Sequence, residues 1–317
     1  MNTILFTGAG SFTGYWFVKE LVRAGYSVIA PLKRQFSEYE GVRLERLNQL
    51  KPICQLIENC PFGSDQFISL INSQPSWSLI CHHAADVTNY KSPDFNPINA
   101  LANNTHNLRG ILHALKLKGA PPILLTGSVF EQGEGRGSDS LPAVSPYGLS
   151  KGLTWDYFKY YCAVEGIPLA KFVIPNPFGP YEEQRYTAYL MKTWMDGRVA
   201  EVMAPSYERD NIPVTLLANV YAFFVSQIID TKQVMKFSPS YYTESQGAFT
   251  ERFAIEMRKR LDLPCEYNLH EQIGFVEPRS RFNTDRINPS ELDWNESSAW
   301  DELADYYQKS YKTTVCS

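Results

Sequence analysis

Thr7-Gly8-Ala9-Gly10-Ser11-Phe12-Thr13-Gly14 follows an apolar run at residues 3–6 and leads into a helical pattern that begins near Phe12 and ends at Gly25. Glycines at a strand-to-helix turn let the backbone approach a phosphate group, and the helix N-terminus adds positive potential. Such a turn also occurs as an ordinary tight connection. A second strand about 20 residues later favours a dinucleotide site formed by Gly8, Gly10, Ser11, Phe12, Thr13 and Gly14.

Short apolar runs alternate with longer helical stretches up to about residue 175. The runs predict strands at residues 3–7, 27–31, 78–82, 123–126 and 169–174. This alternation indicates an α/β fold with a Rossmann-like, doubly wound parallel sheet at residues 1–175. Shorter helices at 187–197 and 246–261 predict a smaller C-terminal lobe at residues 176–317, and a Gly-rich stretch at 132–140 predicts a mobile loop. Ligands of such sheets bind at the carboxyl ends of the strands, so we expect the chemistry there.

The 317 residues carry a formal net charge of −4, with both signs spread along the chain. This distribution provides no basic stripe for nucleic acid or for an anionic membrane. We find no apolar run long enough to span a bilayer, and we expect no signal peptide because a strand pattern starts at Thr3. These features predict a soluble, cytoplasmic protein. The histidines and cysteines are too scattered to form a ligand set, which predicts no metal site.

The second strand ends in Ala30-Pro31-Leu32-Lys33-Arg34. An acid is expected at this point when the cofactor has a free ribose 2′-hydroxyl. Lys33 and Arg34 can instead pair with a 2′-phosphate, which favours NADP(H) over NAD(H). The two cations are also compatible with a solvated basic turn.

Tyr147-Gly148-Leu149-Ser150-Lys151 places a phenol and an ammonium on one helix face, because positions i and i+4 are neighbours. A nearby cation favours the phenolate, whose parent phenol has an ordinary pKa of about 10, and Tyr147 then becomes a usable acid or base. Standing alone, the pair also fits an amphipathic helix. The strand 123–126 ends in Thr126-Gly127-Ser128, whose hydroxyls can hold a substrate oxygen or simply end the strand, with Thr126 preferred over Ser128.

Together these motifs resemble the extended short-chain dehydrogenase/reductases, specifically the NAD(P)-dependent sugar-nucleotide epimerase, dehydratase and reductase family, along nearly the whole chain. The glycine turn is similar to T-G-x-x-G-x-x-G, with Ser11 in place of the middle glycine and its side chain adding bulk there. The other similar segments are Cys81-His82-His83-Ala84-Ala85 (H-x-A-A), Thr126-Gly127-Ser128-Val129-Phe130 (S/T-x-x-V-Y), Tyr147 with Lys151 (Y-x-x-x-K), Pro175-Asn176-Pro177-Phe178-Gly179-Pro180 (N-x-Y-G-P) and Arg209-Asp210-Asn211-Ile212 (R-D-x-I).

The resemblance implies a role for each matching position. Thr126 would be the catalytic hydroxyl, Tyr147 the acid/base, and Lys151 both the tuner of Tyr147 and a ligand of the nicotinamide ribose. It also implies a homodimer formed through helices at 97–117 and 147–165. Ala84, Ala85 and Pro175 would contact the cofactor, Asn176 and Arg209 the substrate pyrophosphate, with Arg279 and Arg281 near another phosphate position. From the residues alone, Asn176 is equally a turn residue and Arg209 a surface partner of Asp210.

Departures from the family pattern narrow the expected reaction. Dehydratases carry an Asp-Glu pair after the catalytic threonine, and this chain has Gly127-Ser128, which disfavours elimination of water. Lys33 and Arg34 favour an NADPH-dependent reductase of a 4-keto, often 6-deoxy, nucleotide sugar. One alternative is a nucleotide-sugar 4-epimerase with bound NAD. Another is a catalytically silent dinucleotide sensor, which the complete catalytic set argues against. Leu216 stands where an acid usually follows the R-D-x-I segment, a mismatch in the substrate lobe.

Overall fold

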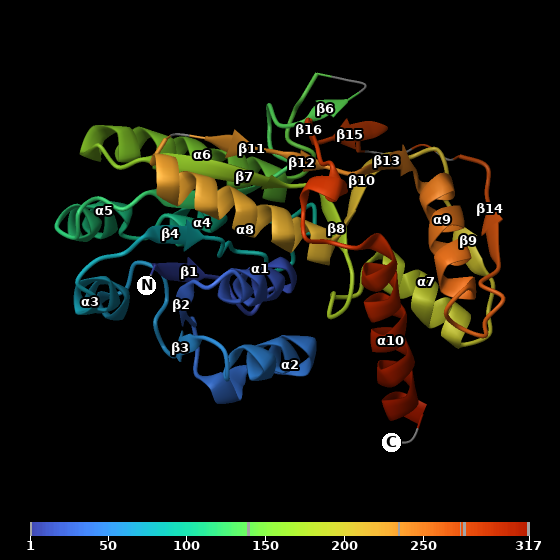
Figure 1. Ribbon diagram of the computed structural model, residues 1–317. Helices are drawn as coiled ribbons and strands as arrows, with labels where there is room; N and C mark the ends of the chain where they lie inside the picture. Colours follow the sequence, from blue (N-terminus) through green and yellow to red (C-terminus); the bar gives the residue numbers. More distant parts are fainter. Residues whose placement is uncertain (1, 138–139, 234, 273, 275–276, 316–317) are drawn as a thin grey trace. The chain divides into compact units, whose positions relative to one another are not determined.

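The computed structural model describes residues 2–137, 140–233, 235–272, 274 and 277–315. They form two compact units (Figure 1). The first comprises residues 1–134, 141–174 and 218–238, and the second comprises residues 135–140, 175–217 and 239–317. The chain therefore passes several times from one unit to the other, and the change of pattern at residue 175 coincides with one of these passages.

A seven-stranded parallel sheet forms the centre of the first unit, with the order β11-β7-β5-β4-β1-β2-β3 in the described residues. Every neighbouring pair is parallel. The predicted Rossmann-like doubly wound sheet is thus confirmed. Strand β1 lies between β2 and β4, so the winding reverses at its carboxyl end, where such sheets bind ligands. The strands are β1 Thr3–Thr7, β2 Ser27–Pro31, β3 Gln55–Ile57, β4 Leu79–His82, β5 Ile123–Ser128, β7 Leu169–Ile174 and β11 Lys236–Phe237.

Three strands of this sheet differ from the sequence prediction. Strands β3 and β11 were not predicted, because three and two residues are too few to show a period. Strand β5 continues two residues beyond its predicted end at Thr126, since Gly127 and Ser128 pair with Val173 and Ile174 of β7. Thr126 therefore lies inside a strand and is paired with Phe172 of β7, while the ladder with β4 ends at Leu125.

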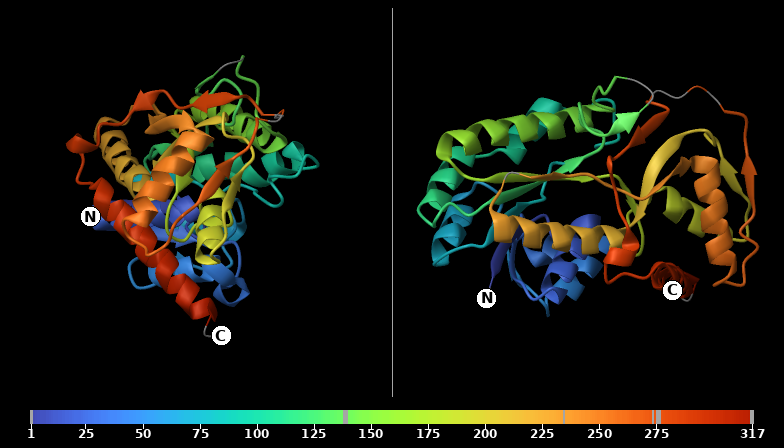
Figure 2. Two further views of the ribbon diagram at one scale, coloured as in Figure 1. Left: turned by 90° about the vertical axis from the view of Figure 1, so that its right-hand side faces the viewer. Right: turned by 45° about the horizontal axis from the view of Figure 1, so that its top comes forward.

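Helices cover both faces of this sheet (Figure 2). One face packs against α3 (Asp65–Ser73), α5 (Leu108–Lys116) and α6 (Pro146–Glu165) through a core that includes Phe67, Ile111 and Phe158. The other face carries α1 (Phe12–Arg23), beside α2 (Gly41–Leu50), and α8 (Val214–Thr231). Helix α4 (Pro97–Asn104) packs on α6, and the short helix η1 is Phe36–Glu38.

Two helix details differ from expectation or need explanation. The single helix predicted at 97–117 is two helices, α4 and α5, because Asn107 adopts a left-handed conformation with φ 49°. Among the described helices, α8 is the one long and apolar enough to cross a membrane, and 56% of that window is buried. The Tyr221 ring of α8 stacks 4.0 Å from the Phe17 ring and also meets Phe172. Its apolar character thus serves the core of the first unit.

The second unit combines a five-stranded sheet with three helices in its described part. The sheet order is β13-β10-β15-β6, with β8 also paired to β10. The predicted loop at 132–140 contains β6, which pairs with β15; residues 138–139 lie outside the described residues. The core includes Phe178, Trp194, Phe253 and Trp300. The elements are β6 Arg136–Gly137, β8 Asn176–Phe178, α7 Tyr186–Met195, β9 Ala200–Val202, β10 Glu208–Pro213, β12 Pro239–Ser240, β13 Tyr242–Ser245, α9 Gln246–Arg258, β14 Tyr267–Leu269, β15 Ser280–Phe282, β16 Asp285–Arg286, η2 Pro289–Glu291 and α10 Glu296–Val315.

Candidate active site

Thr7 ties the carboxyl end of β1 to that of β4. Its Oγ1 accepts hydrogen bonds from the amides of His83 and Ala84, both at 3.1 Å, and lies 3.1 Å from Nδ1 of His82. The next residue, Gly8, has φ +83°, and a Cβ there would lie 2.8 Å from the amide nitrogen of Ala84. Only glycine fits so close to the neighbouring strand. The two strand ends therefore meet at the point where the sheet winding reverses.

The glycine turn and the start of α1 form one rigid piece. A Cβ on Gly14 would lie 2.2 Å from the carbonyl oxygen of Gly8, so the helix packs directly on the turn. Ser11 is the helix N-cap: its Oγ donates to the Gly8 carbonyl at 2.9 Å and accepts from the Gly14 amide at 3.1 Å. The Ser11 side chain, which the sequence predicts as bulk near a pyrophosphate, is thus hydrogen-bonded within the turn. The turn and the positive end of α1 fit a dinucleotide phosphate.

His83 connects this turn to Thr126. Its Nδ1 lies 3.0 Å from Oγ1 of Thr126, and its Nε2 lies 3.0 Å from Oγ of Ser11 and 3.2 Å from Oγ1 of Thr13. Burial, together with the charge of Lys151 and the neighbouring His82, lowers the pKa of His83 to about 3. The imidazole is therefore neutral near neutral pH. Sequence reasoning missed this residue, because it stands at the variable position of the H-x-A-A motif.

Lys151 approaches Thr126 from the opposite side. Its Nζ donates to the carbonyl oxygen of Thr126 at 2.5 Å, and the residue is only 5% exposed. The N-cap residue Ser145 holds the start of helix α6, because its Oγ accepts from the Gly148 amide at 3.2 Å. A Cβ at Gly148 would lie 2.1 Å from the carbonyl oxygen of Phe130, so the helix starts against the turn after β5. Burial lowers the pKa of Lys151 to about 8, with Glu131 opposing and Lys171 adding to the shift.

Tyr147 lies one helical turn before Lys151 and is half-buried. Its ring meets those of Tyr90 and Phe95 edge to face, with centroid distances of 5.3 and 6.1 Å. These rings hold the phenol near the start of α6. The structure thus brings Thr126 and Lys151 into contact and holds Tyr147 on the same helix.

A buried ion network supports the chain after Thr126. Lys171 Nζ binds Glu131 at 2.6 Å and Glu134 at 2.7 Å, and the second oxygen of Glu131 accepts from the Ser128 amide at 2.6 Å. A Cβ at Gly127 would lie 2.6 Å from Cε of Lys171, so an acid at this position, where dehydratases carry one, would have to displace the paired Lys171 side chain. Ser128 Oγ accepts from the Phe130 amide at 3.2 Å and so stabilises the turn.

The two basic residues after β2 are exposed, as a contact to a 2′-phosphate requires. Arg34 uses its backbone amide to bind the Tyr39 hydroxyl at 3.3 Å. Although burial alone would raise it, the pKa of Asp86 is lowered by hydrogen bonds from Thr88 and Asn103 and by the charge of Lys33. Lys33 therefore lies near an acid of the segment after β4.

In the second unit, Arg209 is buried, not a surface residue, and its partner is Glu277, not Asp210. Its Nη1 donates to the carbonyls of Glu208, Pro278 and Arg279 at 2.7, 3.0 and 3.3 Å, and its Nη2 binds Glu277 at 2.9 Å. Burial lowers its pKa to about 9, although Glu277 opposes the shift. Asp210 instead accepts from the amides of Tyr241 and Asn283, at 2.8 and 3.0 Å.

The remaining predicted substrate residues differ in accessibility. Arg279 lines a hollow of about 350 Å³ together with Glu208, Ser245 and Tyr267, a size typical of small-molecule sites. Arg281 is 1% exposed. The Asn176 side chain donates to Oδ1 of Asn211 at 2.6 Å, which joins β8 to β10.

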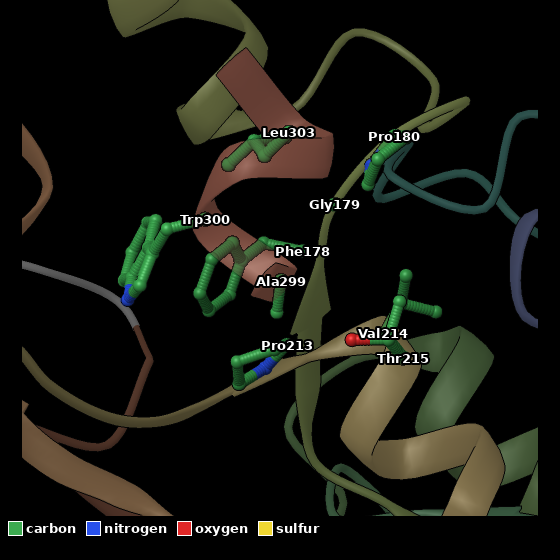
Figure 3. A pocket seen from close by; sticks show the side chains of 9 residues that line it. All are labelled: Phe178, Gly179, Pro180, Pro213, Val214, Thr215, Ala299, Trp300 and Leu303. Atoms are coloured by element: carbon green, nitrogen blue, oxygen red, sulfur yellow. The ribbon is translucent and has the colours of Figure 1, made fainter. Parts of the chain in front are cut away.

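A second cavity of the same unit lies among apolar side chains, including Phe178, Trp300 and Leu303 (Figure 3). Its volume is about 10 Å³. That volume holds one water molecule at most, so the cavity is a packing defect beside the N-x-Y-G-P segment and not a substrate site.

The model of the NAD dependent epimerase/dehydratase family matches residues 4–223, which is more than half of the chain. The chain belongs to this family. The match covers the glycine turn and both Thr126 and the Tyr147-Lys151 pair, so the resemblance to extended short-chain dehydrogenase/reductases is confirmed. This family member is therefore an NAD-dependent enzyme of the short-chain dehydrogenase/reductase type.

Solved structures of similar fold include three 4-epimerases. The UDP-glucuronic acid 4-epimerase of Bacillus cereus, with NAD, is 16% identical with a TM-score of 0.73, covering 98% of this chain and 100% of that one. The UDP-glucose-4-epimerase of Stenotrophomonas maltophila, with bound NAD, is 13% identical with a TM-score of 0.75 and covers 99% of both chains. The UDP-glucose 4-epimerase of Thermotoga maritima is 16% identical with a TM-score of 0.71, covering 97% and 99%. A comparison with curated protein sequences gives no match.

Proposed function

We propose that this family member is a nucleotide-sugar 4-epimerase that uses NAD. The observation that carries the proposal is the contact of Lys151 and His83 with Thr126 beside a glycine turn suited to a dinucleotide. The similar structures named above are 4-epimerases, two of them with NAD, which supports this function over the reductase expected from the sequence.

Each catalytic role follows from the chemistry of the side chain. When bound, NAD supplies a hydride acceptor and, once reduced, a hydride donor. Tyr147 would take the proton of the sugar C4 hydroxyl and return a proton to the C4 oxygen once the configuration at C4 is inverted. Lys151 favours the phenolate by its charge and would hold the nicotinamide ribose of a bound NAD. Thr126 would orient the sugar. The cycle leaves the cofactor and the proton count unchanged.

We assign cofactor binding to the first unit and substrate binding to the second. In the first, the turn from Gly8 to Gly14 would bind the pyrophosphate of the cofactor, with Ala84 and Ala85 as further candidates. Pro175, which follows β7 and is the first residue of the second unit in this part of the chain, is the remaining cofactor candidate. In the second, Asn176 and Arg279 are the accessible candidates for the substrate pyrophosphate, while Arg209 holds the segment 277–279 that carries Arg279.

We further propose a cytoplasmic homodimer that pairs through α4 and α6. Ile98 of α4 is 64% exposed, and Tyr160 and Val164 of α6 are 65% and 61% exposed. These two helices pack against each other and present apolar side chains to solvent. Sedimentation of the purified protein tests this: a monomer at micromolar concentration excludes it.

The test of the epimerase proposal is incubation of the purified enzyme with UDP-glucose and, separately, UDP-glucuronic acid. We expect conversion to the 4-epimer, followed by proton NMR of the sugar, without a lasting change in nicotinamide absorbance. Denaturation of the purified protein should release NAD, which mass spectrometry detects. Absence of epimerisation with these and other nucleotide sugars rejects the proposal.

A reductase of 4-keto nucleotide sugars is the second candidate, favoured by the exposed Lys33 and Arg34 after β2. It would oxidise NADPH in proportion to a 4-keto-6-deoxy nucleotide sugar supplied to it. Net NADPH consumption with that substrate, and none with NADH, would replace the epimerase assignment. A silent sensor is the remaining alternative, and it requires that Tyr147→Phe leave cellular function unchanged.

A further inference from the structure

His83 lies at the junction of the glycine turn and Thr126, and the motif comparison gives it no role. We propose that His83 is a positioning residue: Ser11 fixes it as the Nε2–H tautomer, and its Nδ1 accepts the hydroxyl proton of Thr126. The inference rests on the proposed function only in taking Thr126 as the group that contacts the substrate.

The tautomer follows from the hydrogen bonds of Ser11. A hydroxyl has one proton to donate and two lone pairs. Ser11 Oγ donates to the Gly8 carbonyl at 2.9 Å and accepts from the Gly14 amide at 3.1 Å. One lone pair remains for Nε2 of His83 at 3.0 Å, which favours a proton on Nε2, and Oγ1 of Thr13 at 3.2 Å is a second hydroxyl that can accept from it.

The protonation of the other nitrogen follows from burial. His83 is neutral because burial holds its pKa near 3, and a neutral imidazole has one protonated nitrogen. Nδ1 is then an acceptor, and the donor 3.0 Å away is the hydroxyl of Thr126. Phe6 and Phe17 pack on the ring with centroid distances of 5.6 and 5.3 Å, which prevents it from turning away.

This assignment fixes what Thr126 can do for a substrate. Its carbonyl oxygen accepts from Lys151 at 2.5 Å, and its hydroxyl proton is held by His83. The Thr126 oxygen, which also meets the Tyr221 hydroxyl, therefore offers a lone pair to the substrate and no proton. It can accept a hydrogen bond from a sugar hydroxyl other than the C4 hydroxyl, whose single proton goes to Tyr147.

The neighbouring His82 provides an internal reference. Its Nε2 lies 3.2 Å from the carbonyl oxygen of Asn104, which can only accept, so this nitrogen must be protonated. Its Nδ1 faces Oγ1 of Thr7 at 3.1 Å. His82 thus has the same tautomer on independent grounds, is also buried, and makes no hydrogen bond to Thr126 among those described.

The first experiment is nitrogen-15 NMR of the full-length protein with labelled histidine, which needs no turnover. Signals are assigned from the spectra of His82→Phe and His83→Phe. We expect unprotonated Nδ1 in both histidines, and we expect Thr126→Val to shift Nδ1 of His83 and leave His82 unchanged. A protonated Nδ1 in His83, or a Nδ1 signal unmoved by Thr126→Val, overturns the proposal.

The second experiment is a double-mutant cycle on epimerisation of UDP-glucose. His83→Phe keeps the aromatic packing, and it should lower kcat about tenfold with little change in NADH affinity, the loss expected for one hydrogen bond. In the Thr126→Val background the same substitution should have no further effect, because His83 acts through Thr126. Additive losses overturn the proposal.

Ser11→Gly completes the design by restoring the family's glycine. It should allow protonated and unprotonated Nδ1 to coexist in the His83 spectrum, while Ser64→Gly, which removes an N-cap of α3 elsewhere, should not. An unchanged His83 spectrum in Ser11→Gly removes Ser11 from the proposal. If no nucleotide sugar is turned over, the proposed function fails while these spectra still decide the tautomer.

Discussion

The edge of the parallel sheet in the first unit and the arginine cluster of the second are both buried and polar, but they are organised differently. At the carboxyl edge of the sheet, the Thr7 side chain accepts from the backbone amide of His83, and the side chains of His83 and Thr126 are hydrogen-bonded to each other. In the second unit, Arg209 directs its Nη1 to three backbone carbonyls and its Nη2 to Glu277. Both clusters contain residues that a motif had marked for function.

This difference teaches when the role of a motif residue can be predicted from the sequence. Strand ends of a parallel sheet converge, so residues there face one another wherever the strands are correctly predicted. Arg209 is hydrogen-bonded to a segment about 70 residues later in the chain, so its role depends on where the fold places that segment. We therefore expect substitutions at the sheet edge to affect turnover first, and substitutions at Arg209 to affect stability first.

Tyr147→Phe should have the largest effect. Removing the acid/base should lower epimerisation by about 10³-fold, within the range for general acid–base catalysis. NADH binding and thermal stability should remain near wild type, because the ring still packs on Tyr90 and Phe95. Tyr157→Phe, on the exposed side of the same helix, is the matched control. Full activity in Tyr147→Phe would exclude the assigned mechanism.

Arg209→Met should reduce the free energy of unfolding by about 3 kcal/mol, because the buried guanidinium donates to four acceptors that all lose their donor. Arg198→Met removes the exposed pair with Asp196 and should leave the free energy of unfolding nearly unchanged, because water screens such a pair. Urea denaturation measures both. A stable Arg209→Met protein with lost substrate affinity would instead make Arg209 a ligand, as the R-D-x-I resemblance implied.

Acid should destabilise the first unit through its two buried histidines. Burial, with a contribution from Lys151, lowers the pKa of both His82 and His83 to about 3. The unfolded chain takes up protons near pH 6.5, and the folded chain does not, so stability is lost as the pH falls from about 6.5 toward 3. Each histidine contributes up to about 1.4 kcal/mol per pH unit. His83→Phe should reduce the slope of the free energy of unfolding against pH by the equivalent of about one proton. An unchanged slope would contradict the burial of a neutral His83.

Replacing Lys33 and Arg34 by alanine should have the smallest effect. If both bind a 2′-phosphate, NADPH affinity should fall by about tenfold while NADH affinity stays constant. Lys159→Ala, on the exposed side of α6, provides the control. Fluorescence titration of the reduced cofactors measures the change. An NADPH affinity that is the same in wild type and variant would mean that Lys33 and Arg34 form only a solvated turn, and NAD would remain the proposed cofactor.

The sequence determined the sheet, the glycine turn and the positions of Thr126, Tyr147 and Lys151. These features have local physical causes: apolar runs form strands, glycine alone tolerates the φ of Gly8, and i, i+4 spacing puts Tyr147 and Lys151 on one helix face. The same reasoning explains the failures at β3 and β11, which are too short to show a period.

Tertiary structure alone decided how the polar side chains are paired. His83 is unremarkable in sequence, because its partners Ser11 and Thr126 lie 72 and 43 residues away and meet it only when β1, β4 and β5 align. The close packing at Gly127 depends in the same way on the side chains of Lys171 and Glu131. Hydrogen bonds and close packing act over a few ångströms, so their partners are set by the folded chain and not by spacing along the sequence.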